Sequence, residues 1–232
     1  MKEQLWETIV GIRTYSPLVH SIANYVVMNN TANALLAAGA SPVMAHAHSE
    51  MNDMVAIAGA LVINIGTLDE YWVESMKLAA QQANLLKKPW VLDPVGAGAT
   101  PYRNQVLEEL QIYRPTVIRG NASEIMALAK AQSKTKGVDS TNLSEEALEA
   151  AQQLSHTTGA VVCVSGATDY VVSQNDFKTI SNGHKLMARV TGMGCTASAL
   201  IGAACAVNPY EPYMATVAVS YTHLTLPTIC SV

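Results

Sequence analysis

The segment 190–195 (VTGMGC) is a glycine-rich turn that leads directly into an alanine-rich segment with helical character. Two glycines allow the backbone to turn its N–H groups toward one point, and the start of a helix adds a partial positive charge. This arrangement suits a bound phosphate, or the charge that builds up on a phosphoryl group during its transfer. An ordinary loop before a helix has the same glycine spacing, so the motif alone favours neither interpretation.

Two carboxylates follow apolar strand candidates. Asp93 ends the run WVLD and is followed by Gly96 and Gly98, and Glu124 lies in the run NASE after another strand candidate. Open α/β sheets place ligands at the carboxyl ends of their strands, where a carboxylate can hold Mg²⁺ directly or through water. The alternative roles are structural: Asp93 could cap the next turn, and Asn121 with Glu124 has the spacing of a capping box.

Arg119 precedes Asn121 and could bind phosphate through its forked guanidinium group. Two carboxylates and an arginine at neighbouring strand ends, together with a glycine-rich helix start, predict metal-assisted phosphoryl transfer. None of these features would support that reaction alone.

Cys195 stands at the start of the helix that follows the glycine turn, where the pKa of a thiol should be lowered. A nucleophilic cysteine usually needs a base beside it, and the sequence shows none nearby. The alternative is a small buried residue without a chemical role. The pair His46 and His48 has no third ligand at zinc spacing, so a pocket-lining role for His46 or His20 is favoured over a metal site.

The elements that would position these residues alternate along the chain. Short apolar runs predict strands, and the segments between them have apolar residues three and four apart, as in Trp72, Met76, Ala79, Ala83 and Leu86. A second helix is expected from Asn142 to Gly159. The strand candidates are Pro17–Ser21, Pro42–His46, Leu61–Ile65, Trp90–Leu92, Thr116–Ile118 and Val161–Val164. This pattern predicts an α/β fold with a mostly parallel central sheet and helices on both faces.

The pattern changes near Ala167. Asp169–Gln174 and Lys178–Val190 alternate polar and apolar residues, and Asn182-Gly183 is typical of a hairpin turn. Helical character returns at Cys195–Val207. No linker or repeat interrupts the chain, so residues 1–220 are expected to form a single domain.

The last twelve residues, Tyr221–Val232, break the helical spacing that begins at Tyr213–Val219. They form a short β-like strip without a following partner. We expect residues 221–232 to be an aberrant tail, and favour its standing in place of missing C-terminal helices over its being an extension.

The composition supports a soluble globular protein. Half of the 232 residues are hydrophobic, 14% are charged and the formal net charge is −4, without a basic stripe, so no nucleic-acid partner is expected. The four cysteines lack the spacing of a disulfide framework and no signal peptide is evident, which predicts a cytoplasmic protein. No apolar run is long enough to span a bilayer, so no membrane association is expected.

Several motifs together resemble the hydroxyethylthiazole kinase family, in order and along nearly the whole chain to about Ser220. They are SPLVHSIANYVVMNNTANALLAAGASPVMAHA, INIGTL, PWVLDPVGAGA, IRGNASEI, VVCVSGATDYV and VTGMGCTASALIGA. The resemblance implies a ribokinase-like fold and transfer of the γ-phosphate of ATP to the hydroxyl of 4-methyl-5-(2-hydroxyethyl)thiazole. It also implies a homotrimer with active sites at the subunit interfaces. Relatives continue with further helix beyond the point where the match ends at Tyr221.

The same resemblance implies roles for individual residues. The thiazole alcohol would be bound by Met44, Asn24, His20 and Gly194; ATP by Arg119, Ser165 and Asn121; Mg²⁺ by Asp93 and Glu124; and catalysis would involve Gly194 and Cys195. Cys195 stands where many ribokinase relatives carry an aspartate base, so it could act as a weak base or only order the hydroxyl.

Two other enzymes of the same fold remain alternatives, a hydroxymethylpyrimidine-type kinase and an ATP-dependent nicotinamide-hydrate dehydratase. Both usually carry aspartate at the position of Cys195. A non-catalytic thiazole-binding protein is the alternative from another class, because a fold alone does not establish activity.

Overall fold

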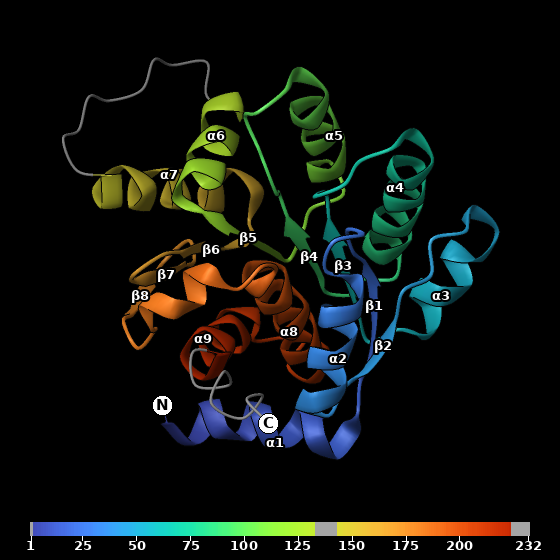
Figure 1. The fold of residues 1–232 in the computed structure, drawn as a ribbon, viewed down its shortest axis with the longest axis horizontal. Coiled ribbons are helices and arrows are strands. Elements are labelled where there is room, and N and C mark those ends of the chain that lie inside the picture. Colours follow the sequence, from blue (N-terminus) through green and yellow to red (C-terminus); the bar gives the residue numbers. More distant parts are fainter. Residues whose placement is uncertain (1, 133–142, 224–232) are drawn as a thin grey trace.

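The computed structural model describes residues 2–132 and 143–223, and all strands in these ranges belong to one eight-stranded sheet (Figure 1). The strand order is β2-β1-β3-β4-β5-β6-β7-β8. The bounds are β1 Leu18–Ile22, β2 Ser41–Val43, β3 Ala60–Asn64, β4 Trp90–Asp93, β5 Val117–Asn121, β6 Val161–Ser165, β7 Asp169–Val172 and β8 Phe177–Ile180.

The first six strands run parallel, from β2 through β6, and β7 and β8 add an antiparallel edge. Parallel strands need a crossover between them, and a helix lies between successive strands from β1 to β6 (Figure 1). This arrangement brings the carboxyl ends of β1 to β6 to one edge of the sheet, where Asp93, Asn121 and Ser165 end β4, β5 and β6.

Helices cover both faces of the sheet. One face packs against α3 Met51–Ile57, α4 Glu70–Leu85, α5 Pro101–Gln111, α6 Ala122–Gln132 and α7 Leu143–Thr158. The other face packs against α1 Lys2–Tyr15, α2 Met28–Ala38, α8 Met193–Val207 and α9 Pro212–His223. Two short 3₁₀ segments, His48–Glu50 and Lys185–Arg189, complete the described elements. The predicted α/β class with a mostly parallel sheet is confirmed.

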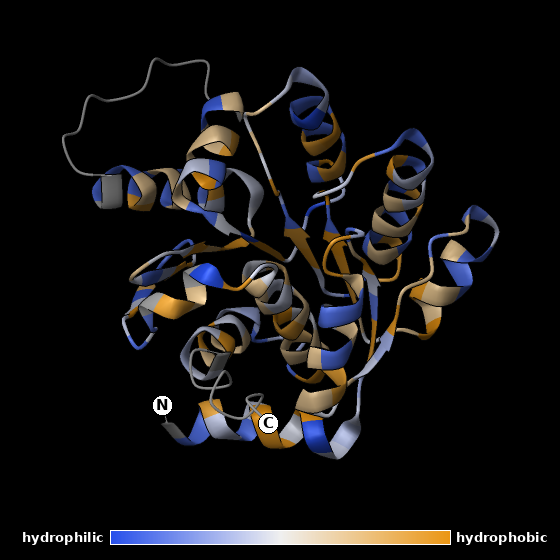
Figure 2. Cartoon of the chain, viewed as in Figure 1, coloured by the Kyte–Doolittle hydropathy of each residue, from blue (hydrophilic) through white to orange (hydrophobic). Residues whose placement is uncertain are grey.

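The sequence of each central strand explains this layering. In β4, Trp90 and Leu92 enter the core under α3 to α7, whereas Val91 enters the core under α8 and α9. Successive side chains point to opposite faces, so a strand buried on both sides must be apolar throughout. Figure 2 shows this as hydrophobic colour along the central strands.

Three predictions need correction. The hairpin of β7 and β8 turns at residues 173–176, where Ser173 N donates to the carbonyl of Asp176 at 2.8 Å, and not at Asn182-Gly183. The second strand ends at Ile180, and a 3₁₀ segment follows it. The strand expected over Pro42–His46 ends at Val43, so Met44 lies in the loop that follows.

The C-terminal helix α9 continues through Tyr221 to His223, so the expected loss of helical spacing at Tyr221 is not observed. The carbonyl of Tyr221 accepts a hydrogen bond from Asn182 Nδ2 at 2.6 Å. The rest of the expected tail, residues 224–232, lies outside the described residues, as does Asn142, the expected start of α7.

Across the ranges 2–132 and 143–223, none of the helices combines the length and the apolar character that a membrane crossing requires.

Candidate active site

A cavity of about 770 Å³ lies where the ends of β5 and β6 face the start of α8. Arg119, Asn121 and Ser165 line its sheet side, and Gly194 lines its helix side. These are the predicted ATP-binding residues and the predicted anion-binding glycine, so the structure brings these four together. The other lining residues are Cys163, Gly166, Ala167, Asp169, Gly183, His184, Met187, Met193, Ala197, Ile201 and Ser220.

The glycine turn forms the amino-terminal end of α8. Gly192 precedes the helix with a φ of 80°, in the left-handed region that favours glycine, and its carbonyl accepts the N–H of Thr196 at 2.8 Å. The helix therefore begins at Met193, two residues before the predicted start at Cys195. Its first N–H groups have no partner within the helix, and the helix dipole favours negative charge there. The turn is suited to binding an anion, as predicted.

The guanidinium group of Arg119 lies against Gly194. A Cβ atom built on Gly194 would overlap Nη1 of Arg119, so only glycine leaves room for the arginine at this point. Burial raises the pKa of Asp93, Asp169, Cys163 and Cys195, and the positive charge of Arg119 partly opposes the shift at each of these four groups. Arg119 is thus placed to bind a phosphate beside the start of α8.

Asp93 ends β4 and is only 1% exposed. Its Oδ2 atom accepts hydrogen bonds from Asn64 Nδ2 at 2.7 Å and from Ser198 Oγ at 2.8 Å. The pKa of Asp93 is raised to about 6, mainly by burial and to a smaller extent by the negative charge of Glu124. Arg119 and the two hydrogen bonds oppose this shift. A carboxylate with this raised pKa in a buried site is typical of a functional residue.

Cys195 does not have the lowered pKa that its place at a helix start predicts. Burial, followed by the negative charge of Asp93, raises the pKa of the thiol, and the hydrogen bonds from Asn64 and Asn24 do not compensate. Asn24 Nδ2 lies 3.6 Å from Cys195 Sγ. The prediction of a favoured thiolate is therefore wrong, because the effect of the helix end is outweighed by desolvation.

Glu124 forms the capping box that was the structural alternative. Its Oε2 accepts the N–H of Asn121 at 2.8 Å, and Asn121 Oδ1 accepts the N–H of Glu124 at 2.9 Å. Its other oxygen, Oε1, accepts the N–H of Gly96 at 2.9 Å, in the turn after Asp93. Glu124 therefore joins the start of α6 to the loop after β4 and lies near enough to Asp93 to raise its pKa.

The three predicted thiazole-binding side chains lie near the ends of β1 and β2. Asn24 follows β1, is buried, and reaches Cys195. Met44 follows β2 and is half-buried. His20 lies within β1, is fully buried, and contacts the carbonyl of Ala45 at 2.8 Å through Nε2, so it supports the loop that carries Met44. Burial lowers the pKa of His20 and favours the neutral ring.

Asp169 and Asn64 are site residues that the sequence analysis missed. Asp169 lines the cavity and accepts the N–H of Gly166 at 3.0 Å, which fixes the loop after Ser165. Asn64 ends β3 opposite Asp93 in the parallel register. A signal was available for Asn64, because it is a polar residue near the carboxyl end of an apolar strand candidate, but an amide is a weaker indication of chemistry than a carboxylate.

Arg103 on α5 was also missed. It donates to the carbonyls of Ile65 at 2.6 Å, Val95 at 2.8 Å and Gly66 at 2.9 Å. One guanidinium group thereby joins the loops that follow β3 and β4. Nothing in the sequence around Arg103 marks this role.

The arrangement of acidic groups fits Mg²⁺ bound together with a phosphate ligand. In the part of the chain that the structure describes, no three His, Cys, Asp or Glu side chains are grouped to hold a metal ion alone. Mg²⁺ is usually bound by one or two carboxylates, waters and substrate phosphates, so the pair of Asp93 and Glu124 beside Arg119 is compatible with it.

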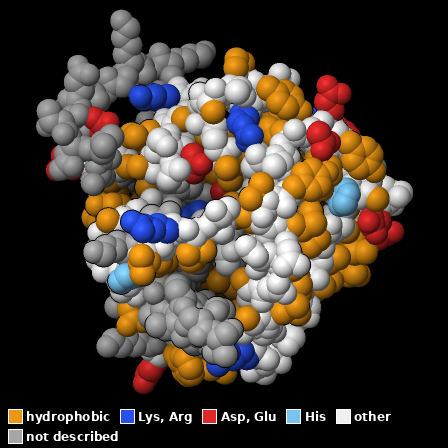
Figure 3. All heavy atoms as spheres, in the orientation of Figure 1, with side chains coloured by type: hydrophobic (Ala, Val, Ile, Leu, Met, Phe, Trp, Pro, Cys, Tyr) orange, Lys and Arg blue, Asp and Glu red, His pale blue; other side chains and the backbone are white. Residues whose placement is uncertain are grey.

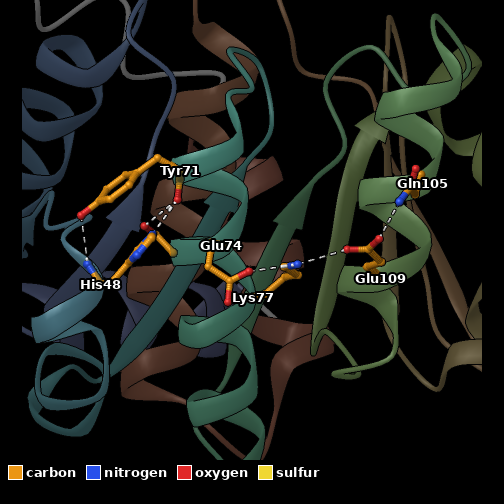
Figure 4. Close-up of polar contacts among 7 residues, drawn as sticks. His48, Tyr71, Glu74, Lys77, Gln105 and Glu109 are labelled. Atoms are coloured by element: carbon orange, nitrogen blue, oxygen red, sulfur yellow. Dashed lines mark hydrogen bonds and ion pairs between the residues drawn. The ribbon is translucent and has the colours of Figure 1, made fainter.

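Two separate sets of polar contacts lie outside the cavity (Figure 4). One joins α4 to α5, and the other joins α4 to the 3₁₀ segment His48–Glu50. Lys77 pairs with Glu74 at 3.0 Å and with Glu109 at 3.5 Å, and His48 stacks on Tyr71 with ring centroids 3.9 Å apart. Exposed pairs of this kind contribute little to stability. We assign these contacts no part in the chemistry of the site.

Comparisons with known proteins identify the family. A sequence profile described as the hydroxyethylthiazole kinase family matches residues 9–225. The hydroxyethylthiazole kinase of Leptospira biflexa is 57% identical over 203 residues, which cover 87% of this chain and 76% of the relative. A solved hydroxyethylthiazole kinase from Pyrococcus horikoshii OT3 has a TM-score of 0.86 and 46% identity, covering 94% of this chain and 82% of that one.

A ribokinase-like superfamily protein from Enterococcus faecalis, 13% identical, has a TM-score of 0.66 and covers 99% of this chain and 86% of that one. At this identity the likeness concerns the fold alone, and it confirms the ribokinase-like prediction. The family profile and the relatives also confirm the resemblance found in the motifs. The chain belongs to the hydroxyethylthiazole kinase family.

Proposed function

We propose that the protein transfers the γ-phosphate of ATP to the hydroxyl group of 4-methyl-5-(2-hydroxyethyl)thiazole. The observation that carries this proposal is the cavity in which Gly194, at the start of α8, meets the guanidinium group of Arg119 beside the buried Asp93. Phosphoryl transfer depends mainly on positioning and on stabilising negative charge, and this cavity supplies both. The high identity to named kinases supports the same reaction.

On the nucleotide side, we assign the phosphates of ATP to Arg119, Ser165 and Asn121. Bound Mg²⁺ would neutralise charge on the phosphates, and Asp93 and Glu124 would hold it. The free N–H groups of the first turn of α8, which include that of Gly194, would stabilise the phosphoryl group during its transfer.

On the acceptor side, we assign the thiazole alcohol to Met44 and Asn24, with His20 supporting the loop that carries Met44. Cys195 would order the hydroxyl group, because its raised pKa keeps the thiol protonated near neutral pH. The attacking oxygen forms a bond to the γ-phosphorus as the bond to the leaving ADP breaks, and the hydroxyl proton is released. A loose transition state needs little help from a base, so a thiol can suffice at this position.

We also propose a cytoplasmic homotrimer with active sites at the subunit interfaces. Tyr25 and Val26, next to Asn24, are 62% and 65% exposed, so an apolar surface adjoins the proposed acceptor site. Figure 3 shows hydrophobic side chains gathered on the part of the surface that α3 and α4 form. Large exposed apolar patches often mark interfaces.

The test is ATP consumption with a panel of alcohols, analysed by mass spectrometry for the phosphorylated product. The thiazole alcohol should give a monophosphate and one ADP for each turnover. Preference for hydroxymethylpyrimidine, or ATP-dependent dehydration of a hydrated nicotinamide cofactor, would overturn the substrate assignment. Calorimetric binding of the thiazole without binding of Mg-ATP would indicate a non-catalytic binding protein.

A further inference from the structure

The side-chain amide of Asn64 joins two parts of the site that lie on different strands. Its Nδ2 donates to Asp93 Oδ2 at 2.7 Å, and its Oδ1 accepts from Asn24 Nδ2 at 2.8 Å. Asn24 Nδ2 in turn lies 3.6 Å from Cys195 Sγ. A continuous path of hydrogen bonds thus runs from Asp93 through Asn64 and Asn24 to the thiol.

Backbone N–H groups fix the orientation of both amides. The N–H of Gly66 donates to Asn64 Oδ1 at 2.9 Å, and the N–H of Val26 donates to Asn24 Oδ1 at 3.1 Å. Since a backbone N–H can only donate, each oxygen is identified, and each NH₂ group must point toward the site. Asn24 is also confined sterically, because a Cβ atom on Gly66 would lie 2.5 Å from its Nδ2.

The hydrogen bonds to Asp93 fix the orientation of its carboxylate. Within the described ranges, the hydrogen bonds to its side chain come from Asn64 and Ser198, and both end on Oδ2. Two donors on one oxygen fix the plane of the carboxylate and leave Oδ1 without a hydrogen-bond donor among the described residues. Asn64 and Asn24 are 3% and 4% exposed, so water does not readily replace either amide.

We propose that Asn64 is a positioning residue. It holds the Asp93 carboxylate and, through Asn24, the Cys195 thiol in the relative position that phosphoryl transfer requires. The inference rests on the proposed kinase function, which brings the phosphate to Asp93 and the acceptor hydroxyl to Cys195. Displacements of about 1 Å in a site of this kind can cost on the order of a hundredfold in rate. Asn64 acts through its neighbours, so its loss should affect turnover more than binding.

The test compares Asn64→Ala with Ser155→Ala. Ser155 on α7 is also fully buried and donates one hydrogen bond, to the carbonyl of Ala160 at 2.8 Å. Its replacement by alanine therefore controls for the loss of a buried hydrogen bond. Asn64→Ala should lower kcat by roughly 10- to 100-fold and leave KM for ATP and for the thiazole within about threefold. Ser155→Ala should leave kcat within about twofold of the original protein.

A second readout needs no substrate. The rate at which iodoacetamide alkylates Cys195, measured by peptide mass spectrometry, should change at least about threefold in Asn64→Ala and remain unchanged in Ser155→Ala. If Asn64→Ala does not fold, Asn64→Leu replaces it, because leucine keeps much of the volume but loses the donor to Asp93 and the acceptor for Gly66 and Asn24.

An unchanged kcat or an unchanged alkylation rate in the folded Asn64 variant would overturn the inference, and so would a loss confined to KM. Failure of the proposed function has a different signature, the absence of thiazole-dependent ATP consumption in the unaltered protein. In that case the alkylation rate alone decides whether Asn64 positions Cys195.

Discussion

Asp93 is the residue at which function and stability are opposed. Its carboxyl group is fully buried, and its pKa is raised to about 6. Between the usual value of 3.8 and about 6, the folded protein holds a proton that the unfolded chain releases, so stability falls as the pH rises through this window. Above it, the buried charge costs up to about 3 kcal/mol.

Asp93→Asn should therefore raise the melting temperature at pH 8 by several degrees while lowering kcat by at least about a hundredfold. Thermal melts from pH 4 to 8 and steady-state kinetics measure the two effects. The gain in melting temperature should shrink as the pH is lowered, because Asp93 becomes neutral in the folded protein below about pH 6 and in the unfolded chain only below its usual pKa of 3.8. An equal gain at every pH would show that the charge of Asp93 is not its cause.

Gly194 is required for steric reasons that can be tested directly. Gly194→Ala should reduce turnover by at least about a hundredfold, and Gly194→Val should abolish it, because the added Cβ displaces Arg119 from the phosphate site. Gly11→Ala is the matched control, since this helical glycine also faces a neighbour but its Cβ would make an ordinary contact of 3.6 Å with Val207. Full activity in Gly194→Ala would remove Arg119 and Gly194 from the mechanism.

Cys195→Ala should be less damaging than Gly194→Val, with kcat lowered by roughly tenfold. The thiol is mainly protonated near neutral pH because its pKa is raised, so it supplies little base strength. Steady-state kinetics of both variants give the comparison. A more severe loss in Cys195→Ala would mean that the thiol acts as a strong base or a nucleophile.

At the level of elements, the capping box at the start of α6 gives Glu124 two functions. Its carboxylate accepts the N–H groups of Asn121 and Gly96, so Glu124→Gln leaves at least one of them facing an NH₂ group. The variant should lose both activity and about 1 kcal/mol of stability, or about 2–4 °C in melting temperature. Lys77→Ala, on the outer side of α4 and away from the cavity, is the control and should alter neither quantity.

A melting temperature unchanged in Glu124→Gln, together with a loss of kcat, would assign the carboxylate to metal binding alone. The opposite result, reduced stability with full activity, would assign it to the cap alone.

For the whole molecule, the proposed trimer places the exposed residues beside Asn24 at a subunit interface. Val26→Glu should yield monomers with little activity, because a charge at a buried interface cannot be solvated. Tyr210→Glu is the control, at a residue that is 93% exposed on the loop between α8 and α9. Light scattering measures the mass, and a Val26→Glu protein that is trimeric and active would place the interface elsewhere.

The sequence alone determined the family, the α/β class and most strand positions. Strands buried on both faces must be apolar throughout, and the glycine turn before α8 is a local feature of the backbone. Both can therefore be recognised in short segments of the sequence. The same locality allowed the two carboxylates, Arg119 and the glycine turn to be placed at one edge of the sheet in advance. Ser165 and Asn121 were assigned to ATP only through the resemblance to the family.

The tertiary structure decided the properties that depend on distant segments. The pKa of Cys195 is set by burial and by Asp93, which is 102 positions away in the sequence, and this outweighs the local effect of the helix start. The loops at the site depend on Arg103, and the geometry of Asp93 depends on Asn64 and Ser198 from a different strand and a different helix. Hydrogen bonds and desolvation act through space, so no spacing rule within one segment could have identified them.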